Sequence, residues 1–221
     1  MPDASRPDRS APPERIELTA AGVVMRRHRG DDVDALHEAI EQSRDHLRLF
    51  MFWADQDRAA SAEFVGRAVA EWDAGTAFGY LITPTDPTGA PAAGDVPGRG
   101  SVIGGCGVGR APSGLWEIGY WLRSGATGRG VMTAVARALT DLAFSSSNTE
   151  RVAIRCDVAN TASAAVARRL GFTLTDTVDH PVQAPGHTGR MMVWTIGRGE
   201  WPVAPPPQSS SSEPSSFEPS S

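Results

Sequence analysis

The 221-residue chain contains no lysine, so all 21 of its basic residues are arginines. The absence of lysine excludes enzymes that form a Schiff base through a lysine amine, and nucleotide-binding loops that need a lysine beside the phosphates. Acidic residues number 26, and the resulting net charge of −5 argues against a general nucleic-acid-binding protein. No apolar run approaches the roughly 18 residues that a membrane-spanning helix needs. We therefore expect neither nucleic acid nor a membrane as a partner.

Cysteine is also scarce, because the chain has only Cys106 and Cys156. Two cysteines cannot form a disulfide framework, and each lies in an apolar run, so we expect two buried reduced thiols. The five histidines show no spacing typical of metal ligands, and we predict no metal site. His180 and His187 lie in a stretch with proline and glycine and are expected in a loop.

Composition predicts one folded domain over residues 14–201. Residues 1–13 are polar and proline-rich, lack the apolar centre of a signal peptide, and are expected to be disordered in a cytoplasmic protein. Residues 202–221 contain six prolines and eight serines, and such a composition predicts a disordered tail. Residues 84–100 lack apolar periodicity and indicate an extended loop between two strands.

Apolar periodicity and glycine or proline breaks divide this domain into alternating strands and helices. We expect strands at 23–27, 78–83, 101–108, 115–122, 151–157, 172–178 and 191–196. We expect helices at 31–43, 58–72, 131–144 and 161–170, with either a short helix or a turn at 46–53. Gly75 and Gly171 are predicted to end two of these helices. This mixed order predicts an α/β architecture with helices on both faces of a sheet.

A glycine-rich turn joins the expected strand at 115–122 to the helix that starts at Val131. It contains Gly125, Gly128 and Gly130. The first N–H groups of a helix have no internal acceptor and carry the positive end of its dipole, so glycines before them can form a phosphate cradle. Arg129 would add charge at its rim. The glycine spacing differs from the dinucleotide-binding pattern, and glycines that serve turn geometry alone are the alternative.

A second glycine cluster lies within the strand expected at 101–108 and its end. It consists of Gly104, Gly105, Gly107 and Gly109. Glycine inside a strand leaves a bare surface on which a helix or a ligand can lie close to the backbone. The sequence alone does not distinguish the helix from the ligand.

Two longer segments resemble the GNAT superfamily of acetyl-CoA-dependent N-acetyltransferases. They are WEIGYWLRSGATGRGVMTAVARAL at 116–139 and RVAIRCDVANTASAAVARRLGF at 151–172. SRDHLRLFMFW at 43–53 and VIGGCGV at 102–108 add a likeness to the RimJ/RimL branch, which acetylates the N-termini of ribosomal proteins. The resemblance implies a mixed, mostly antiparallel sheet of six to seven strands, splayed in the middle, with helices on both faces. It also places the two cysteines on strands that flank a third, too far apart for a disulfide.

The same resemblance implies how acetyl-CoA binds. The superfamily's pyrophosphate loop, Q/R-x-x-G-x-G/A, falls on residues 127–132, where threonine and methionine replace its first and last residues. Main-chain amides would still hold the pyrophosphate. Leu122 and Arg123 would pair with the pantetheine arm, and Asn160 would hydrogen-bond it. The implied loop residues are Thr127, Gly128, Arg129, Gly130, Val131, Met132 and Thr133.

Catalytic roles also follow from the resemblance. Many relatives place a tyrosine acid four residues before the closing Gly-Phe, where this chain has Ala167. Ser163 is expected to act on the leaving sulfur instead, and Glu117 on the attacking amine. A backbone N–H within 117–122 would stabilise the oxyanion. The alternatives are a capping or surface serine, a carboxylate that only pairs with an arginine, and attack without a dedicated base.

The acceptor is expected to be a primary amine, in first place the α-amine of a protein N-terminus. Phe50, Phe52 and Trp53 would line the acceptor side, or else belong to the core. A small amine such as an antibiotic or a polyamine is the first alternative acceptor. A non-catalytic acyl-CoA-binding regulatory module is the second alternative function. The protein is expected to be a monomer or a homodimer.

Overall fold

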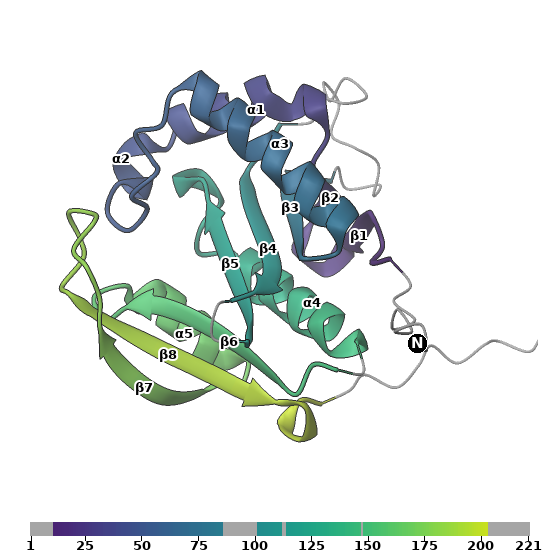
Figure 1. Cartoon of the computed structure of the whole chain (residues 1–221). Helices are drawn as coiled ribbons and strands as arrows, with labels where there is room; N and C mark the ends of the chain where they lie inside the picture. Colours follow the sequence, from purple (N-terminus) through teal and green to yellow (C-terminus); the bar gives the residue numbers. More distant parts are fainter. Residues whose placement is uncertain (1–10, 86–100, 112–113, 147, 203–221) are drawn as a thin grey trace, which may run out of the picture.

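The computed structural model describes residues 11–85, 101–111, 114–146 and 148–202. Its strands form one eight-stranded sheet in the order β1-β2-β3-β4-β5-β6-β8-β7 (Figure 1). All neighbouring strands are antiparallel except β5 and β6, which are parallel. The strands are β1 (Arg15–Leu18), β2 (Val23–Arg27), β3 (Ala77–Pro84), β4 (Gly104–Arg110), β5 (Trp116–Leu122), β6 (Arg151–Asp157), β7 (Thr173–Asp179) and β8 (Arg190–Gly197).

Helices cover both faces of the sheet, as expected (Figure 1). Three lie over one face of the N-terminal half: α1 (Val33–Glu41), α2 (Arg44–Leu47) and α3 (Arg58–Ala74). Two lie on the opposite face: α4 (Val131–Ser145) and α5 (Thr161–Arg169). Two apolar clusters follow from these layers. The larger joins α4 and α5 to the sheet, and the smaller joins α1 and α3 to Leu81 and Val102.

The structure differs from the sequence expectation mainly at element ends. The expected count of six to seven strands is wrong, because the sheet has eight. The strand β1 was not expected, because RIEL alternates too briefly and has no fully buried residue. The helix expected at 31–43 divides into a short 3₁₀ turn at Gly30–Asp32 followed by α1. The cause is Asp32, whose buried carboxylate accepts hydrogen bonds from the guanidinium of Arg26 and the amide of Arg29. These bonds fix the start of the helix after Asp32.

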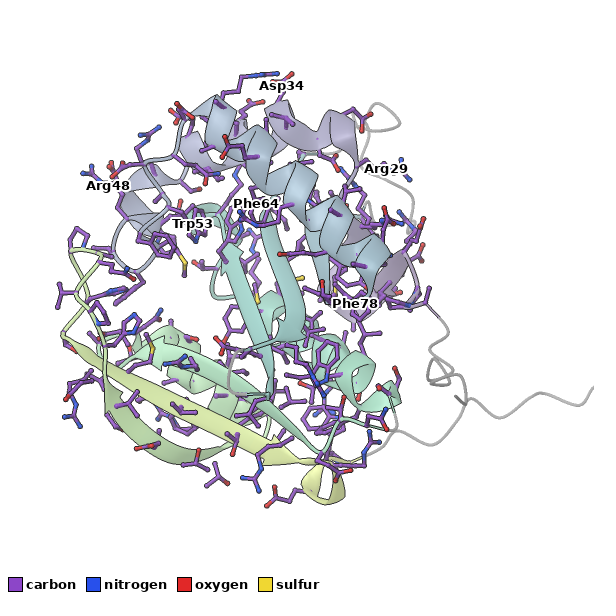
Figure 2. All side chains as sticks on the ribbon, in the orientation of Figure 1. Arg29, Asp34, Arg48, Trp53, Phe64 and Phe78 are labelled. Atoms are coloured by element: carbon purple, nitrogen blue, oxygen red, sulfur yellow. The ribbon has the colours of Figure 1, made fainter. Side chains whose placement is uncertain are left out.

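The segment between α2 and α3 places aromatic side chains on the side of the helical layer that faces the sheet. Residues 48–57 form turns and irregular backbone, so only the first part of the short element expected at 46–53 is helical. Trp53 lies in this segment, and Phe64 lies on α3 (Figure 2). Phe52 is 66% exposed, whereas Trp53 packs edge-on against Trp121 of β5 at 5.8 Å between ring centroids.

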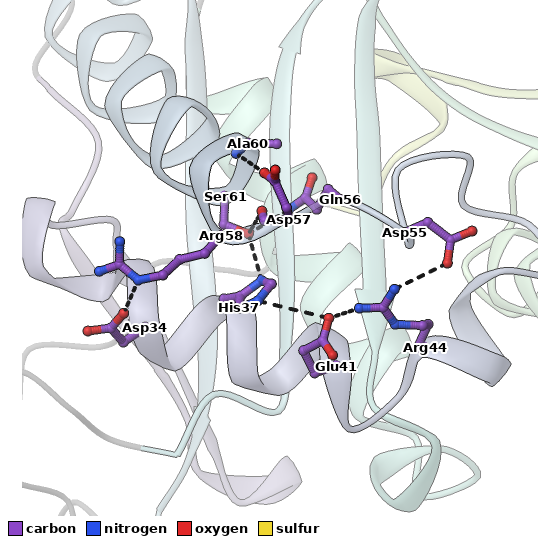
Figure 3. Close-up of polar contacts among 10 residues, drawn as sticks. All are labelled: Asp34, His37, Glu41, Arg44, Asp55, Gln56, Asp57, Arg58, Ala60 and Ser61. Atoms are coloured by element: carbon purple, nitrogen blue, oxygen red, sulfur yellow. Dashed lines mark hydrogen bonds and ion pairs between the residues drawn. The ribbon is translucent and has the colours of Figure 1, made fainter.

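Polar contacts join the three helices of this layer (Figure 3). Buried Ser61 on α3 lies 3.2 Å from Nδ1 of His37 on α1, and it accepts a hydrogen bond from Gln56. Arg58 reaches Asp34 at 2.7 Å. Asp57 caps the start of α3 through the amide of Ala60, and Glu41 pairs with Arg44. Polar contacts therefore hold the three helices to one another, in addition to their packing on the sheet.

The strands β5 and β6 separate along their length. They pair only from Trp116 opposite Val152 to Ile118 opposite Ile154. Beyond that point β5 stays paired with β4 up to Leu122, while β6 stays paired with β8 up to Asp157. Each strand is held by its outer neighbour as the two part. The sheet is thus splayed in the middle, as the resemblance implies.

The segments expected to be disordered or looped fall largely on residues 1–10, 86–100 and 203–221, which lie outside the described residues. Cys106 and Cys156 are both buried and free, on β4 and β6. These strands flank β5, as expected. His180 and His187 lie in the connection between β7 and β8. Within the described part of the chain, we find no helix that is both long and apolar enough to span a membrane.

Candidate active site

A large cleft of about 1620 Å³ opens where β5 and β6 part. Its walls come from the helical layer, from β4 and β5, from the first turns of α4 and α5, and from the β7–β8 connection. Ten of the twelve site residues predicted from the sequence line it: Glu117, Leu122, Thr127, Gly128, Gly130, Val131, Met132, Thr133, Asn160 and Ser163. Arg123 and Arg129 do not. The fold therefore brings together residues that are up to 46 positions apart, as the numbers 117 and 163 show.

The turn before α4 has the backbone geometry of an anion cradle. Gly128 and Gly130 have φ values of +77° and +78°, which residues with a side chain rarely adopt. A Cβ atom on either glycine would meet nothing within 4 Å, so the turn is open toward the cleft. No side chain of the described residues caps the start of α4, and the first N–H groups of this helix are left to an external acceptor.

The remaining residues of the predicted loop divide between the surface and the core. Thr127 is exposed, and its hydroxyl bonds back to the carbonyl of Ser124 at 2.8 Å. Arg129 is exposed at the rim of the turn. Val131 is buried, and Met132 packs against the core. The bulk of Met132 is thus directed partly into the protein, on the helix side of the cradle.

The prediction that Leu122 and Arg123 pair with the pantetheine arm stays a prediction, but the amide of Arg123 already has a partner within the sheet. Its N–H donates to the carbonyl of Ile103, next to β4, at 2.8 Å. Neighbouring residues of a strand aim their amides at opposite sides, so the amides of Leu122 and Tyr120 point toward the gap beside β6. The Arg123 side chain bonds Gln42 and the carbonyl of Val102 instead.

The start of α5 holds two of the predicted residues. Asn160 is the N-cap of α5, and its side-chain oxygen accepts a hydrogen bond from the amide of Ser163 at 3.1 Å. Asn160 therefore fills the capping role considered for Ser163. The Ser163 hydroxyl lies 2.9 Å from the hydroxyl of Tyr120 on β5. It bridges the gap where the two strands separate.

Tyr120 was missed as a functional candidate. The family resemblance places a tyrosine acid on the helix, at the position where this chain has Ala167. The structure instead places a tyrosine hydroxyl next to Ser163 from the neighbouring strand. Burial raises the pKa of Tyr120, which keeps its proton at neutral pH. The alternation of side chains along β5 could have indicated this role, because it directs Tyr120 to the same face as Ile118 and Leu122.

Glu117 lies on the other face of β5. Burial raises the pKa of its carboxyl, and the charge of Arg155 opposes that rise. The two side chains are 3.9 Å apart, and the Glu117 side chain is 34% exposed. A partly buried carboxyl with a raised pKa is suited to proton transfer, and its ion pair with Arg155 is long and partly exposed.

Comparison with known proteins identifies the family. Residues 23–173 match the family described as "Acetyltransferase (GNAT) domain". The chain belongs to the GNAT acetyltransferase family. This GNAT protein is 33% identical over 85 residues to "Putative ribosomal N-acetyltransferase YdaF" of Bacillus subtilis (strain 168). That alignment covers 38% of this chain and 46% of the relative, so it spans less than half of the relative's length.

Solved structures share the fold of this GNAT protein. The ribosomal L7/L12 α-N-acetyltransferase RimL, in complex with coenzyme A, has a TM-score of 0.69 at 23% identity and covers 83% of this chain and 98% of its own. RimJ of Mycobacterium smegmatis has a TM-score of 0.68 at 21% identity, and the match covers 86% of this chain and 88% of RimJ. The microcin C7 self-immunity acetyltransferase MccE, in complex with acetyl-CoA and AMP, has a TM-score of 0.70 at 19% identity. The match covers 85% of this chain and 98% of MccE. The expected fold and the expected family are confirmed.

Proposed function

We propose that this GNAT protein transfers the acetyl group of acetyl-CoA to a primary amine, and that the amine is the α-amine of a protein N-terminus. The observation that carries the proposal is the arrangement around the splayed strands. A turn suited to anions ends one side of the cleft, and a Tyr120–Ser163 pair and Glu117 lie on opposite faces of β5. Donor and acceptor can thus approach the same point from two sides.

The donor side would consist of the α4 turn and the free edge of β5. The amides at the start of α4 would hold the pyrophosphate, with Gly128 and Gly130 giving it room. The pantetheine arm would extend along the gap and pair with the amide of Leu122 or Tyr120. Asn160 also lines the cleft, and its side-chain amide N–H₂ would donate to this arm.

The leaving sulfur would accept a hydrogen bond from the Ser163 hydroxyl and depart as a thiolate, which takes its proton from solvent. Tyr120 keeps its proton, so it would donate to the Ser163 oxygen and leave the serine O–H free to face the sulfur. As the carbon–sulfur bond breaks, negative charge grows on the sulfur and this hydrogen bond strengthens. The backbone amide of Tyr120 or Leu122, which points into the gap, would donate to the oxyanion in the same step.

The attacking amine must first lose a proton, because free α-amines are largely protonated near neutral pH. Glu117 would accept that proton directly or through water, since its raised pKa brings it nearer to the amine in basicity. The names of the relatives favour a ribosomal protein N-terminus as the acceptor: YdaF is named for a ribosomal target, and RimL for an N-terminal amine.

One screen tests this proposal. Thiol release from acetyl-CoA is measured with a panel of N-terminal peptides and with small amines, including a polyamine. We expect release with the peptides, and mass spectrometry should locate the acetyl group on the α-amine. The same peptides with a blocked N-terminus are the control. Release with small amines alone would overturn the peptide assignment, and tight acetyl-CoA binding with no release would indicate a non-catalytic module.

A further inference from the structure

A row of glycines crosses three adjacent strands on the floor of the cleft. Gly79 of β3 is paired with Gly107 of β4, and Gly107 is paired with Gly119 of β5. All three line the cleft. The row therefore leaves bare backbone across the middle of the sheet, in a direction perpendicular to the strands.

This row faces the helical layer. Gly119 lies on the same face of β5 as Glu117 and Trp121, and Trp121 packs in the apolar cluster of α1 and α3. The opposite wall of the cleft comes from α3, through Ala60, Glu63 and Phe64. Phe64 is 36% exposed on the side that faces the sheet (Figure 2). We refer to the space between the glycine row and α3 as the glycine trough.

The outer end of the trough has room for a ligand. A Cβ atom on Gly119 would meet no atom of the described residues within 4 Å, and its backbone needs no positive φ. A side chain there would project only into the cleft. Glu117, two residues away on the same face, lies at this end of the trough.

The inner end of the trough is closed by His28. Its side chain is only 4% exposed but lines the cleft. Its Cδ2 and Nε2 atoms lie 3.4 and 3.6 Å from the position of a Cβ on Gly79, and its ring meets Phe64 edge-on at 5.5 Å. Its Nδ1 atom is buried without a hydrogen-bond partner among the described residues.

His28 offers a hydrogen-bond donor to the trough. Burial lowers its pKa to about 4, so the ring is neutral at physiological pH and carries one proton. A buried acceptor without a partner is tolerated better than a buried N–H without one, so we assign the proton to Nε2. Nε2 is the nitrogen beside Gly79, so its N–H is available to a ligand that carries an oxygen acceptor.

We infer that the glycine trough binds the acceptor as an extended peptide laid across the strands, with a carbonyl near its third residue accepting from His28. The inference rests on the proposed acetyl transfer. Gly119 and Gly79 are two strand spacings apart, or about 10 Å. An extended chain advances about 3.3–3.6 Å per residue, so an amine beside Gly119 puts the third residue at His28. A floor without side chains fits a peptide backbone.

Acceptor length tests this inference. The acceptors are alaninamide and the amides of di-, tri- and tetra-alanine, and kcat/KM is measured for each. We expect a rise of about fivefold from the dipeptide to the tripeptide, which is the factor of one ordinary hydrogen bond, and no further rise with the tetrapeptide. His28→Phe keeps the ring beside Phe64 but lacks the N–H. It should remove the rise from the dipeptide to the tripeptide.

Gly119→Val tests the floor. It should lower kcat/KM for all four acceptors at least tenfold without changing the affinity for acetyl-CoA, measured by calorimetry. Gly66→Val is the matched control, because Gly66 of α3 also has no neighbour within 4 Å of its Cβ position and does not line the cleft. It should leave the whole series unchanged.

The outcomes separate this inference from the proposed function. If peptides are acetylated but kcat/KM is independent of length, or if Gly119→Val has no effect, the trough is not the peptide site and acetyl transfer stands. If a diamine is acetylated with the same kcat/KM as tri-alanine amide, the extended-peptide assignment is overturned. If acetyl-CoA does not bind, the proposed function itself fails.

Discussion

The hydroxyl of Tyr120 lies 2.9 Å from that of Ser163, across the gap between β5 and the start of α5. The contact joins a strand to a helix 43 residues later in the chain. It exists because β5 and β6 separate after Ile118, which lets the first turn of α5 approach the face of β5. A serine at this place therefore has a fixed partner and a fixed orientation.

Tyr120→Phe should lower kcat about fivefold with little change in KM for acetyl-CoA. The change removes one hydroxyl and keeps the ring, and a neutral hydrogen bond contributes about 1 kcal/mol. Ser163→Ala should lower kcat about 10- to 100-fold, because its bond to the developing thiolate is worth about 1.5–3 kcal/mol. Steady-state kinetics with one good acceptor measures both.

The double variant distinguishes a shared role from two separate ones. If Tyr120 acts only through Ser163, the double variant should be no slower than Ser163→Ala, and the two losses should not add. Losses that multiply would mean that Tyr120 acts independently. A Ser163→Ala variant with the kcat of the parent would remove both residues from the chemistry.

Glu117→Gln should abolish the acidic limb of the kcat/KM profile. Glu117 accepts a proton only when ionised, so activity in the parent should fall as the pH drops through its raised pKa. Glutamine keeps the shape and has no such titration. The parent profile is measured first, with the same acceptor. An unchanged limb and rate in the variant would make Glu117 structural.

The same variant should lose activity but gain thermal stability at neutral pH. A carboxyl whose pKa is raised on folding binds its proton more tightly in the folded protein, so its contribution favours folding below the ordinary pKa and opposes folding as the pH rises through the raised pKa. Glu117→Gln should therefore raise Tm at neutral pH, and this gain should vanish near pH 4. Arg155→Gln, which removes the partner 3.9 Å away, should instead lower Tm at neutral pH.

Gly130→Asp should weaken acetyl-CoA binding at least tenfold, or about 1.4 kcal/mol. It would place a carboxylate where the pyrophosphate is expected and a side chain at a φ of +78°. Gly125→Asp is the control, since Gly125 belongs to the same turn, is exposed, has no positive φ and does not line the cleft. Calorimetry on both variants, with Tm measured in parallel, separates binding from folding.

The elements of the fold follow closely from local pattern. Every expected strand exists, and α3 ends at Gly75 with φ of +68°, because glycine alone reaches that conformation without strain. The strand β1 was not predicted, because it has only four residues and lies at the edge of the sheet. Its formation depends on pairing with β2, which no property of the four residues reveals.

The site was less predictable than the fold, because it depends on contacts between distant segments. The glycine turn was visible in one stretch of sequence, whereas the Tyr120–Ser163 contact depends on how far β5 and β6 separate. The bond made by the Arg123 amide was unpredictable for a similar reason. Its amide belongs to the β4 side of β5, and one residue of register decides the side.

Asp157 fixes the connection between β7 and β8 beside the cleft, and Asp157→Asn should loosen it. Its buried carboxylate accepts from the amides of Ala159 and Thr188, both at 2.8 Å, and from the Thr188 hydroxyl at 3.0 Å. Burial alone would raise the pKa of Asp157, but these hydrogen bonds outweigh burial and lower it. The same connection reaches the loop after α2, where the amide of Gly186 donates to the carbonyl of Leu49 at 2.8 Å.

A group whose pKa is lowered on folding stabilises the fold above its ordinary pKa, and this stabilisation is lost as the pH falls through the lower value. Asp157→Asn should therefore lower Tm by about 5 °C at pH 7, and the difference from the parent should shrink below about pH 4. KM for a peptide acceptor should rise as well, because the connection forms one wall of the cleft. The control is Asp179→Asn at the end of β7, where a carboxylate with a side chain 91% exposed pairs with Arg190 at the start of β8. If both variants lose the same Tm at every pH, the buried hydrogen bonds of Asp157 do not hold the connection in place.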